Sequence, residues 1–261
     1  MIKFFRHIRQ NLIMKNQTSK PASQTGRYFK YAIGEIILVV IGIMIALQIN
    51  TWKEEQQLKK EERKILQNLA IDFKMRKNEL FEFNEFTIKE LNAIDQMLLQ
   101  CNKPKLIYKA ETLDSLLSFM GNSYSFNDSF QLLDLLFNTG KIDIIENEAL
   151  KKDLLIWPWL VEEHLEETRT IQKIRIEKES TIWEQYISYA DTFSYFNFRD
   201  YRYQIITNPN LKTDHFGLFN NRMFINNLIS RRGTLLIMYN DRVKLIETAD
   251  RILNNIEMDL K

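Results

Sequence analysis

Histidine and glutamate lie at helical spacing in the segment EEHLEE, and such a pair can bind a metal ion. His164 and Glu167 are three residues apart, so a helix would place both on one side. A di-iron bundle, however, needs two Glu-x-x-His motifs and carboxylates from four helices. The sequence contains no Glu-x-x-His motif. We interpret EEHLEE as a solvated acidic face and predict no metal site.

Other chemistry-bearing motifs are also missing from the sequence. No C-x-x-C, H-E-x-x-H, G-x-S-x-G or glycine-rich phosphate-binding motif occurs. The single cysteine, Cys101, cannot form a disulfide within the chain, and we interpret it as a small packing residue. We therefore predict no catalytic residues and no cofactor, and the sequence favours a protein that is not an enzyme.

Glu35 is the charged residue that most invites a functional interpretation, because it lies inside an apolar stretch. It shares one helical face with Gly42 and Ala46, and a Gly-x-x-x-Ala pair allows two membrane helices to approach closely. Two hypotheses remain open. In the first, Glu35 is a proton or ion contact; in the second, which we favour, it lies near the lipid headgroups and bonds to a partner helix.

Residues 31–49, YAIGEIILVVIGIMIALQI, predict a transmembrane helix. These 19 residues carry only one charge and would span about 28 Å as a helix, close to the thickness of the bilayer core. Tyr31 and Trp52 are interfacial aromatic candidates at its two ends. A cleaved signal peptide fits poorly, because the preceding basic region is long and no A-x-A-like site follows. We assign residues 31–50 as an uncleaved span.

The tail before the span is strongly basic, which bears on orientation. Residues 1–30 hold 7 of the 36 Lys and Arg and no Asp or Glu, whereas residues 31–261 hold 29 basic against 34 acidic residues, a net charge of −5. Short basic segments resist translocation, so we predict the tail, an amphipathic helix followed by a linker, in the cytoplasm and residues 51–261 in the periplasm. The acidic main body argues against a nucleic-acid partner.

The rest of the chain is predicted to be all-α: the transmembrane helix continues into an elongated antiparallel bundle of three long helices and two short ones. With only 7 Gly and 4 Pro, the chain is poorly suited to an all-β fold. Apolar periodicity predicts long helices over residues 53–101, 148–189 and 221–261 and short ones over 111–120 and 129–137. Asn147 is the expected N-cap of the second long helix, and Pro158 a kink or break in it.

This order of helices places one aromatic segment near the membrane. If the second long helix returns toward the bilayer, the segment FSYFNFRDYRY that follows it would lie at the headgroups. Aromatic and basic side chains suit that region, and an equally weighted alternative is a loop packed over the base of the bundle. The interface candidates in this segment are Tyr195, Phe196, Phe198, Arg199, Tyr201 and Arg202.

Three segments resemble an uncharacterised family of single-pass inner-membrane proteins from flavobacteria and their relatives, known as a domain of unknown function. They are GEIILVVIGIMIALQINTW at 34–52, LLFNTGKIDIIENEALKKDL at 135–154 and RMFINNLISRR at 222–232. The resemblance implies an anchored helical domain. It implies no catalytic residues and no known activity.

These observations lead us to expect a membrane-anchored, extracytoplasmic helical interaction or scaffold protein in the bacterial inner membrane. The expected partners are the lipid bilayer and either a second copy of the chain or another membrane protein. The alternative is a receptor-like sensor module, or an accessory subunit of an ion-driven membrane complex, that relays through the transmembrane helix. A relay would need a partner, because the sequence contains no cytoplasmic output domain.

Overall fold

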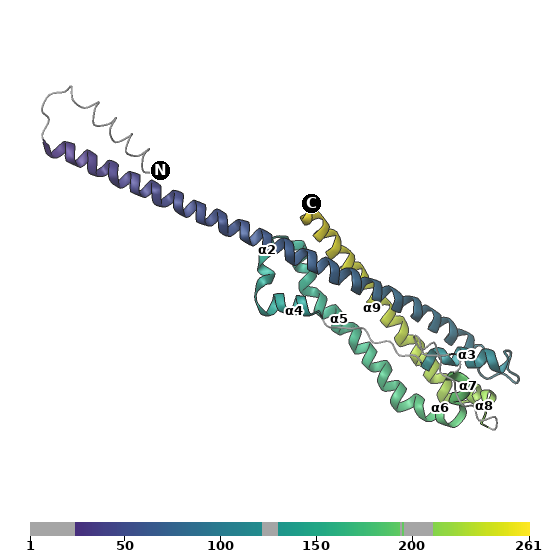
Figure 1. Ribbon diagram of the computed structural model, residues 1–261. Coiled ribbons are helices and arrows are strands. Elements are labelled where there is room, and N and C mark those ends of the chain that lie inside the picture. Colours follow the sequence, from purple (N-terminus) through teal and green to yellow (C-terminus); the bar gives the residue numbers. More distant parts are fainter. Residues whose placement is uncertain (1–23, 122–129, 194, 196–210) are drawn as a thin grey trace. The chain divides into compact units, whose positions relative to one another are not determined.

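The computed structural model describes residues 24–121, 130–193, 195 and 211–261 (Figure 1). Every regular element in these ranges is a helix and none is a strand, which confirms the all-α prediction. The chain divides into two compact units, Met1–Lys60 and Glu61–Lys261, which we call unit 1 and unit 2. The predicted amphipathic helix and most of the predicted linker lie outside the described residues, and residues 24–30, which were predicted to belong to the tail, are already part of the first helix.

Helix α2, Gln24–Leu98, belongs to both units. The predicted transmembrane helix and first long helix are thus one uninterrupted element, as the absence of Pro and Gly between residues 53 and 101 favours. The helix ends just before Asn102, which adopts a left-handed conformation with φ of 55°. Asparagine tolerates this conformation better than most residues, so the predicted end of the helix at this position is confirmed.

Two short helices follow, at the positions that the periodicity predicts. They are α3, Ala110–Gly121, and α4, Gln131–Asn138. Gly140, with φ of +69°, supplies the left-handed turn between α4 and the 3₁₀ helix η1, Lys141–Ile144. The loop predicted between the two short helices falls almost entirely outside the described residues.

The second long helical run extends from Glu148 to Tyr186, close to its predicted range of 148–189, but it is not a regular α-helix throughout. Helix α5, Glu148–Ile174, begins at Asn147, whose side chain accepts a 3.0 Å hydrogen bond from the Leu150 backbone N–H. It continues through Pro158 without a break. A π-helical turn, η2 at Arg175–Glu179, then joins it to α6, Ser180–Tyr186, and the chain becomes extended at Ile187. No residue type at positions 175–179 requires such a turn, so the sequence predicts a regular helix there.

The remaining helices are α7, Tyr189–Phe193; α8, His215–Asn220; and α9, Arg222–Leu260. Asn221 caps α9 by accepting hydrogen bonds from the backbone N–H groups of Met223 and Phe224. Helix α9 therefore begins within a residue of its predicted start.

The direction of α5 is opposite to our expectation. Its start lies beside the first residues of unit 2, where the Glu146 N–H donates to Glu62. The C-terminal end of α5 is followed by α6, α7 and α8. The Phe219 carbonyl in α8 accepts a hydrogen bond from the backbone N–H of Asn102, which lies just beyond the C-terminal end of α2. Within unit 2, α5 and α2 thus run in the same direction and α9 runs antiparallel to both. The reason is that η1 already lies beside Glu61, so the chain has returned before α5 begins.

Two apolar cores hold unit 2 together. One contains Phe73, Phe130 and Trp157, whose rings lie 4.9–5.5 Å apart, together with residues from the last turns of α9. The other surrounds Phe219 and Phe224, which meet edge to face at the opposite end of α9. Between these cores lies a layer of buried charged and polar side chains, described next.

Candidate functional site: the membrane span and a buried ionic layer

Residues 32–50 of α2 expose apolar side chains on every side. Ile36 and Leu47 are 63% and 62% exposed, and the remaining large apolar residues of the stretch are exposed to a similar degree. By length and composition, α2 can cross a membrane, with a mean hydropathy of 2.5 over its apolar window. No part of that window is buried inside the protein.

The residues singled out in and around this stretch lie as follows. Glu35, Gly42 and Ala46 are exposed and share one face of α2, and a side chain added at Gly42 would meet nothing within 4 Å. Trp52 is also exposed, while the side chain of Tyr31 is outside the described part of the structure. Within this part of α2 the geometry leaves room for a helix or lipid against Gly42.

The aromatic segment after α7 is mostly outside the described residues. Tyr195 is exposed, and Phe196, Phe198, Arg199, Tyr201 and Arg202 fall in the part that the structure does not describe. The described residues on either side belong to the end of unit 2 where Asn102 lies, since Ser188 N–H donates to Thr213 and α8 contacts Asn102. A position of this segment at the headgroups required α5 to return toward the bilayer. The observed direction of α5 overturns that expectation.

The charged residues that come together in unit 2 are ones that the sequence analysis did not select. Arg231 of α9 lies at the centre of the buried ionic layer. Its Nε donates to Glu90 Oε1 of α2 at 2.7 Å, its Nη1 donates to Glu179 Oε2 of η2 at 3.0 Å, and its Nη2 donates to the Met120 carbonyl at 3.1 Å. All three ionised side chains are 5% exposed or less.

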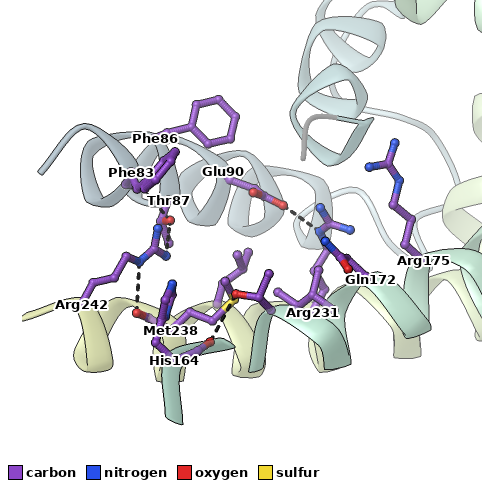
Figure 2. A pocket seen from close by; sticks show the side chains of 13 residues that line it. Phe83, Phe86, Thr87, Glu90, His164, Gln172, Arg175, Arg231, Met238 and Arg242 are labelled. Atoms are coloured by element: carbon purple, nitrogen blue, oxygen red, sulfur yellow. Dashed lines mark hydrogen bonds and ion pairs between the residues drawn. The ribbon is translucent and has the colours of Figure 1, made fainter. Parts of the chain in front are cut away.

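A second guanidinium, that of Arg242, lies in the same layer. It donates to the Met238 carbonyl at 3.1 Å and to Thr87 Oγ1 at 2.7 Å (Figure 2). Within the described residues no carboxylate lies within ion-pair distance of it. Burial lowers the pKa of Arg242 to about 10, against the attraction of Glu90 and Asp241. It remains a cation at neutral pH, so the two arginines balance Glu90 and Glu179.

His164 is buried against this layer, which corrects our interpretation of EEHLEE. The flanking Glu162 and Glu166 are exposed as expected, but His164 is only 2% exposed. Desolvation, reinforced by the positive charge of Arg242, lowers the pKa of His164 to about 4. A neutral imidazole is therefore its state at pH 7. No group of three or more metal-binding side chains occurs in the described ranges.

The π-helical turn explains how Glu179 reaches Arg231. Such a turn accommodates an extra residue in a helix and is common at functional sites. Here it forms residues 175–179, immediately before α6, and Glu179 is its last residue. The neighbouring Arg175 donates to the Gly121 carbonyl at 2.7 Å, so the same turn also holds the end of α3.

Two small cavities border the ionic layer. The first, of about 60 Å³, is lined by side chains that include Thr87, Glu90, His164, Arg231 and Arg242, and Figure 2 shows Thr87 and Glu90 projecting from α2 toward the two guanidinium groups. The second, of about 100 Å³, lies beside Arg175, Glu179 and Trp183. Because a water molecule takes up about 30 Å³ in the liquid, each cavity has room for about two or three water molecules.

Two buried polar atoms line the walls of the second cavity. Glu179 Oε1 and Trp183 Nε1 have no hydrogen-bond partner among the described residues. One is an acceptor and the other a donor, so each requires a small polar partner such as a water molecule. The layer can therefore bind a small polar molecule between its buried arginine and glutamate side chains.

The remaining chemistry-bearing residues have packing roles. His215 Nε2 lies 2.8 Å from Asp114 Oδ1 in a buried contact between α8 and α3. Burial raises the pKa of the Cys101 thiol to about 11, so it stays neutral, in line with the packing role expected for it.

The sequence contained a signal for the ionic layer. Arg231 and Arg242 fall at three- and four-residue steps from Leu228, Leu235 and Met238, on the apolar stripe of α9. A charged residue on such a stripe must be paired or hydrogen-bonded when the stripe is buried. Both arginines interrupt that stripe, so a pattern of apolar residues alone does not reveal them.

Comparisons with known proteins add no assignment. No family model, curated protein or solved structure matches the chain.

Proposed function

We propose that the chain is a membrane-anchored helical interaction protein, with α2 as its anchor and unit 2 as its binding part. The observation that carries this proposal is that residues 32–50 are apolar on every face and are not covered by the chain itself. A helix that is apolar all round is stable only when lipid or protein surrounds it. Lipid is the surrounding that also suits Trp52 at the end of the stretch.

The finer features of the proposal are supported by charge and by resemblance. The seven basic residues before the span favour a cytoplasmic tail and a periplasmic unit 2 in the inner membrane of a bacterium. The likeness of residues 34–52 to the flavobacterial family supports the same single-pass arrangement. The proposed fold of unit 2 is a helical bundle that serves as a scaffold for a second copy or another membrane protein.

Carbonate washing of vesicles tests the anchor. The full chain should stay in the membrane pellet, and a chain lacking residues 31–50 should appear in the supernatant. A chain lacking residues 2–15 is the matched control, since removal of the tail should leave anchoring intact. Release of the full chain by carbonate would refute the proposal.

Fusions at the C-terminus test orientation separately. A periplasmic unit 2 should give alkaline phosphatase activity and no fluorescence from a fluorescent protein that folds only in the cytoplasm. The reverse pattern would show that unit 2 is cytoplasmic while leaving the anchor in place.

The ionic layer favours a second candidate, a sensor module that relays through α2. The first cavity lies between charged residues of three elements, and one of those elements is α2 itself through Glu90. A small ligand that changed the spacing of these elements would act directly on the anchoring helix. A ligand-dependent change in amide hydrogen exchange around Glu90 and Arg231 would support this candidate.

The accessory-subunit alternative depends on Glu35. Under that hypothesis Glu35→Gln should abolish a proton-dependent activity of the complex while leaving assembly intact. Under the packing hypothesis Glu35→Leu should reduce assembly.

A further inference from the structure

Helices α2 and α9 lie side by side in unit 2 and share one outward face, which we call the α2–α9 face (Figure 1). Two ion pairs mark it: Lys77 with Asp250, and Arg232 with Asp95, where Nε donates to Oδ1 at 2.6 Å. Asp95 follows Lys77 by 18 residues, and Asp250 follows Arg232 by the same 18 residues. Because 18 residues make five full helical turns, both pairs lie on the same side of the two helices.

Exposed apolar side chains surround these ion pairs. Phe81 is four residues after Lys77, Ile88 is seven before Asp95, and Leu236 is four after Arg232, so helical spacing places all three on the α2–α9 face. They are 48%, 45% and 38% exposed. Leu99 and Ile229 extend the face past Asp95 and Arg232 and are exposed still more. Exposed apolar side chains gathered on one face favour an interaction site.

The charges on this face form a pattern that is complementary to itself. At one position along the two helices, Lys77 of α2 lies beside Asp250 of α9. Five turns further along α2, the charges are exchanged, and Asp95 of α2 lies beside Arg232 of α9. All four side chains are between 26% and 48% exposed, so each can still reach a group on another molecule. A surface that is neutral overall, with opposite charges side by side, suits a two-fold contact between identical surfaces.

From this pattern we propose that the α2–α9 face binds the same face of a second copy of the chain in a parallel two-fold dimer. A two-fold axis along the helices sets α2 of one copy against α9 of the other at the same level. Asp95 then faces Arg232 of the second copy, and Lys77 faces its Asp250. Phe81, Ile88 and Leu236 lie between these levels and become buried. The parallel orientation rests on the proposed function, since two spans crossing one membrane in the same direction orient both copies alike.

Exchange of charges between two full-length chains tests this contact. Differently tagged copies are expressed together, extracted from membranes in mild detergent, and the second tag is measured after recovery of the first. Asp95→Arg in both copies should lower co-recovery about tenfold, and so should Arg232→Asp in both, because like charges then face each other. Expression of one Asp95→Arg copy with one Arg232→Asp copy should restore it, because opposite charges meet again in a parallel pair.

The controls separate this contact from loss of the fold or of the anchor. Leu155→Lys, at an exposed apolar position on α5, should leave co-recovery unchanged. Circular dichroism should show the same helix content in all variants, since the altered side chains are partly exposed. Unchanged co-recovery with both single variants, or no restoration in the mixed pair, would overturn the proposed dimer. Carbonate washing of the same vesicles reports on the anchor alone, so a chain that stays in the pellet without co-recovery refutes the dimer and not the proposed function.

Discussion

The Arg231 and Glu90 side chains form an ion pair in the interior of unit 2, with Nε donating to Oε1 at 2.7 Å and with 3% and 5% of the two side chains exposed. Burial raises the pKa of Glu90 even though Arg231 attracts its charged form, because removing the carboxylate from water costs more than the attraction returns. The layer is therefore held by the hydrogen bonds that Arg231 donates to Glu90, Glu179 and the Met120 carbonyl. A substitution that removes one of these side chains should lower the stability of the whole of unit 2.

Arg231→Met should be strongly destabilising, because it leaves Glu90 and Glu179 buried without their shared partner. Breaking a buried ion pair on one side costs about 3–5 kcal/mol. Replacing Arg231, Glu90 and Glu179 together by Met should recover part of that loss, because the two carboxylates that Arg231 would leave unpaired are then removed, while Arg242 loses the attraction of Glu90. Urea unfolding followed by circular dichroism measures both variants, and a triple variant less stable than Arg231→Met would contradict this account.

His164 should make the stability of unit 2 depend on pH. Burial lowers its pKa from 6.5 to about 4, so the unfolded chain binds a proton at this site more readily than the folded chain. The stabilising contribution is complete above pH 6.5 and is lost as the pH falls through about 4. A shift of this size corresponds to roughly 3 kcal/mol.

His164→Gln isolates this effect from other titrating groups. The raised pKa of Glu90 acts in the opposite sense, because protonation of a carboxylate in the folded state favours folding as the pH falls. The difference in unfolding free energy between His164→Gln and the unaltered chain should therefore change between pH 7 and pH 4. A constant difference across that range would show that His164 keeps its ordinary pKa in the folded protein.

Gly42→Ile tests close packing between spans. Gly42 and Ala46 share a face of α2, and a bulky side chain at Gly42 would hold a second helix away. Crosslinking within the membrane should fall, whereas Leu47→Ile, at another exposed position of the span, should leave it unchanged. Equal crosslinking of both variants would exclude the Gly42 face as a contact between spans.

Local signals in the sequence mark where elements begin and end, and the N-cap predicted at Asn147 is confirmed. Asn147 and Asn221 cap α5 and α9, and Gly140 supplies the turn after α4, because capping and left-handed turns depend on one or two residues. The direction of α5 could not be read in this way. Apolar periodicity shows which side of a helix is buried. It does not depend on whether the helix runs parallel or antiparallel to its neighbour.

The ionic layer could not be predicted from the sequence without knowledge of tertiary contacts. Arg231 and Arg242 lie on the buried stripe of α9, but their partners Glu90, Glu179 and Thr87 are 52 to 155 residues away in sequence. The π-helical turn that brings Glu179 into place has no sequence signature of its own. The sequence could have shown that these charges require partners, and only the fold shows which ones.

Pro158→Ala should stabilise unit 2, because α5 runs through Pro158 without a break. Proline in a helix interior is about 3 kcal/mol less favourable than alanine, since it lacks an N–H and crowds the preceding turn. Part of the gain is lost because alanine gives the unfolded chain more freedom, so we expect an increase of about 1–2 kcal/mol in the free energy of unfolding.

The neighbouring exposed residue provides the control for this prediction. Trp159→Ala removes an exposed side chain on the same turn and should change stability by less than about 0.5 kcal/mol. Urea unfolding of both variants is the measurement. Lower stability of Pro158→Ala would mean that the local geometry imposed by proline is what seats Trp157 against Phe73 and Phe130, where the indole ring is fully buried.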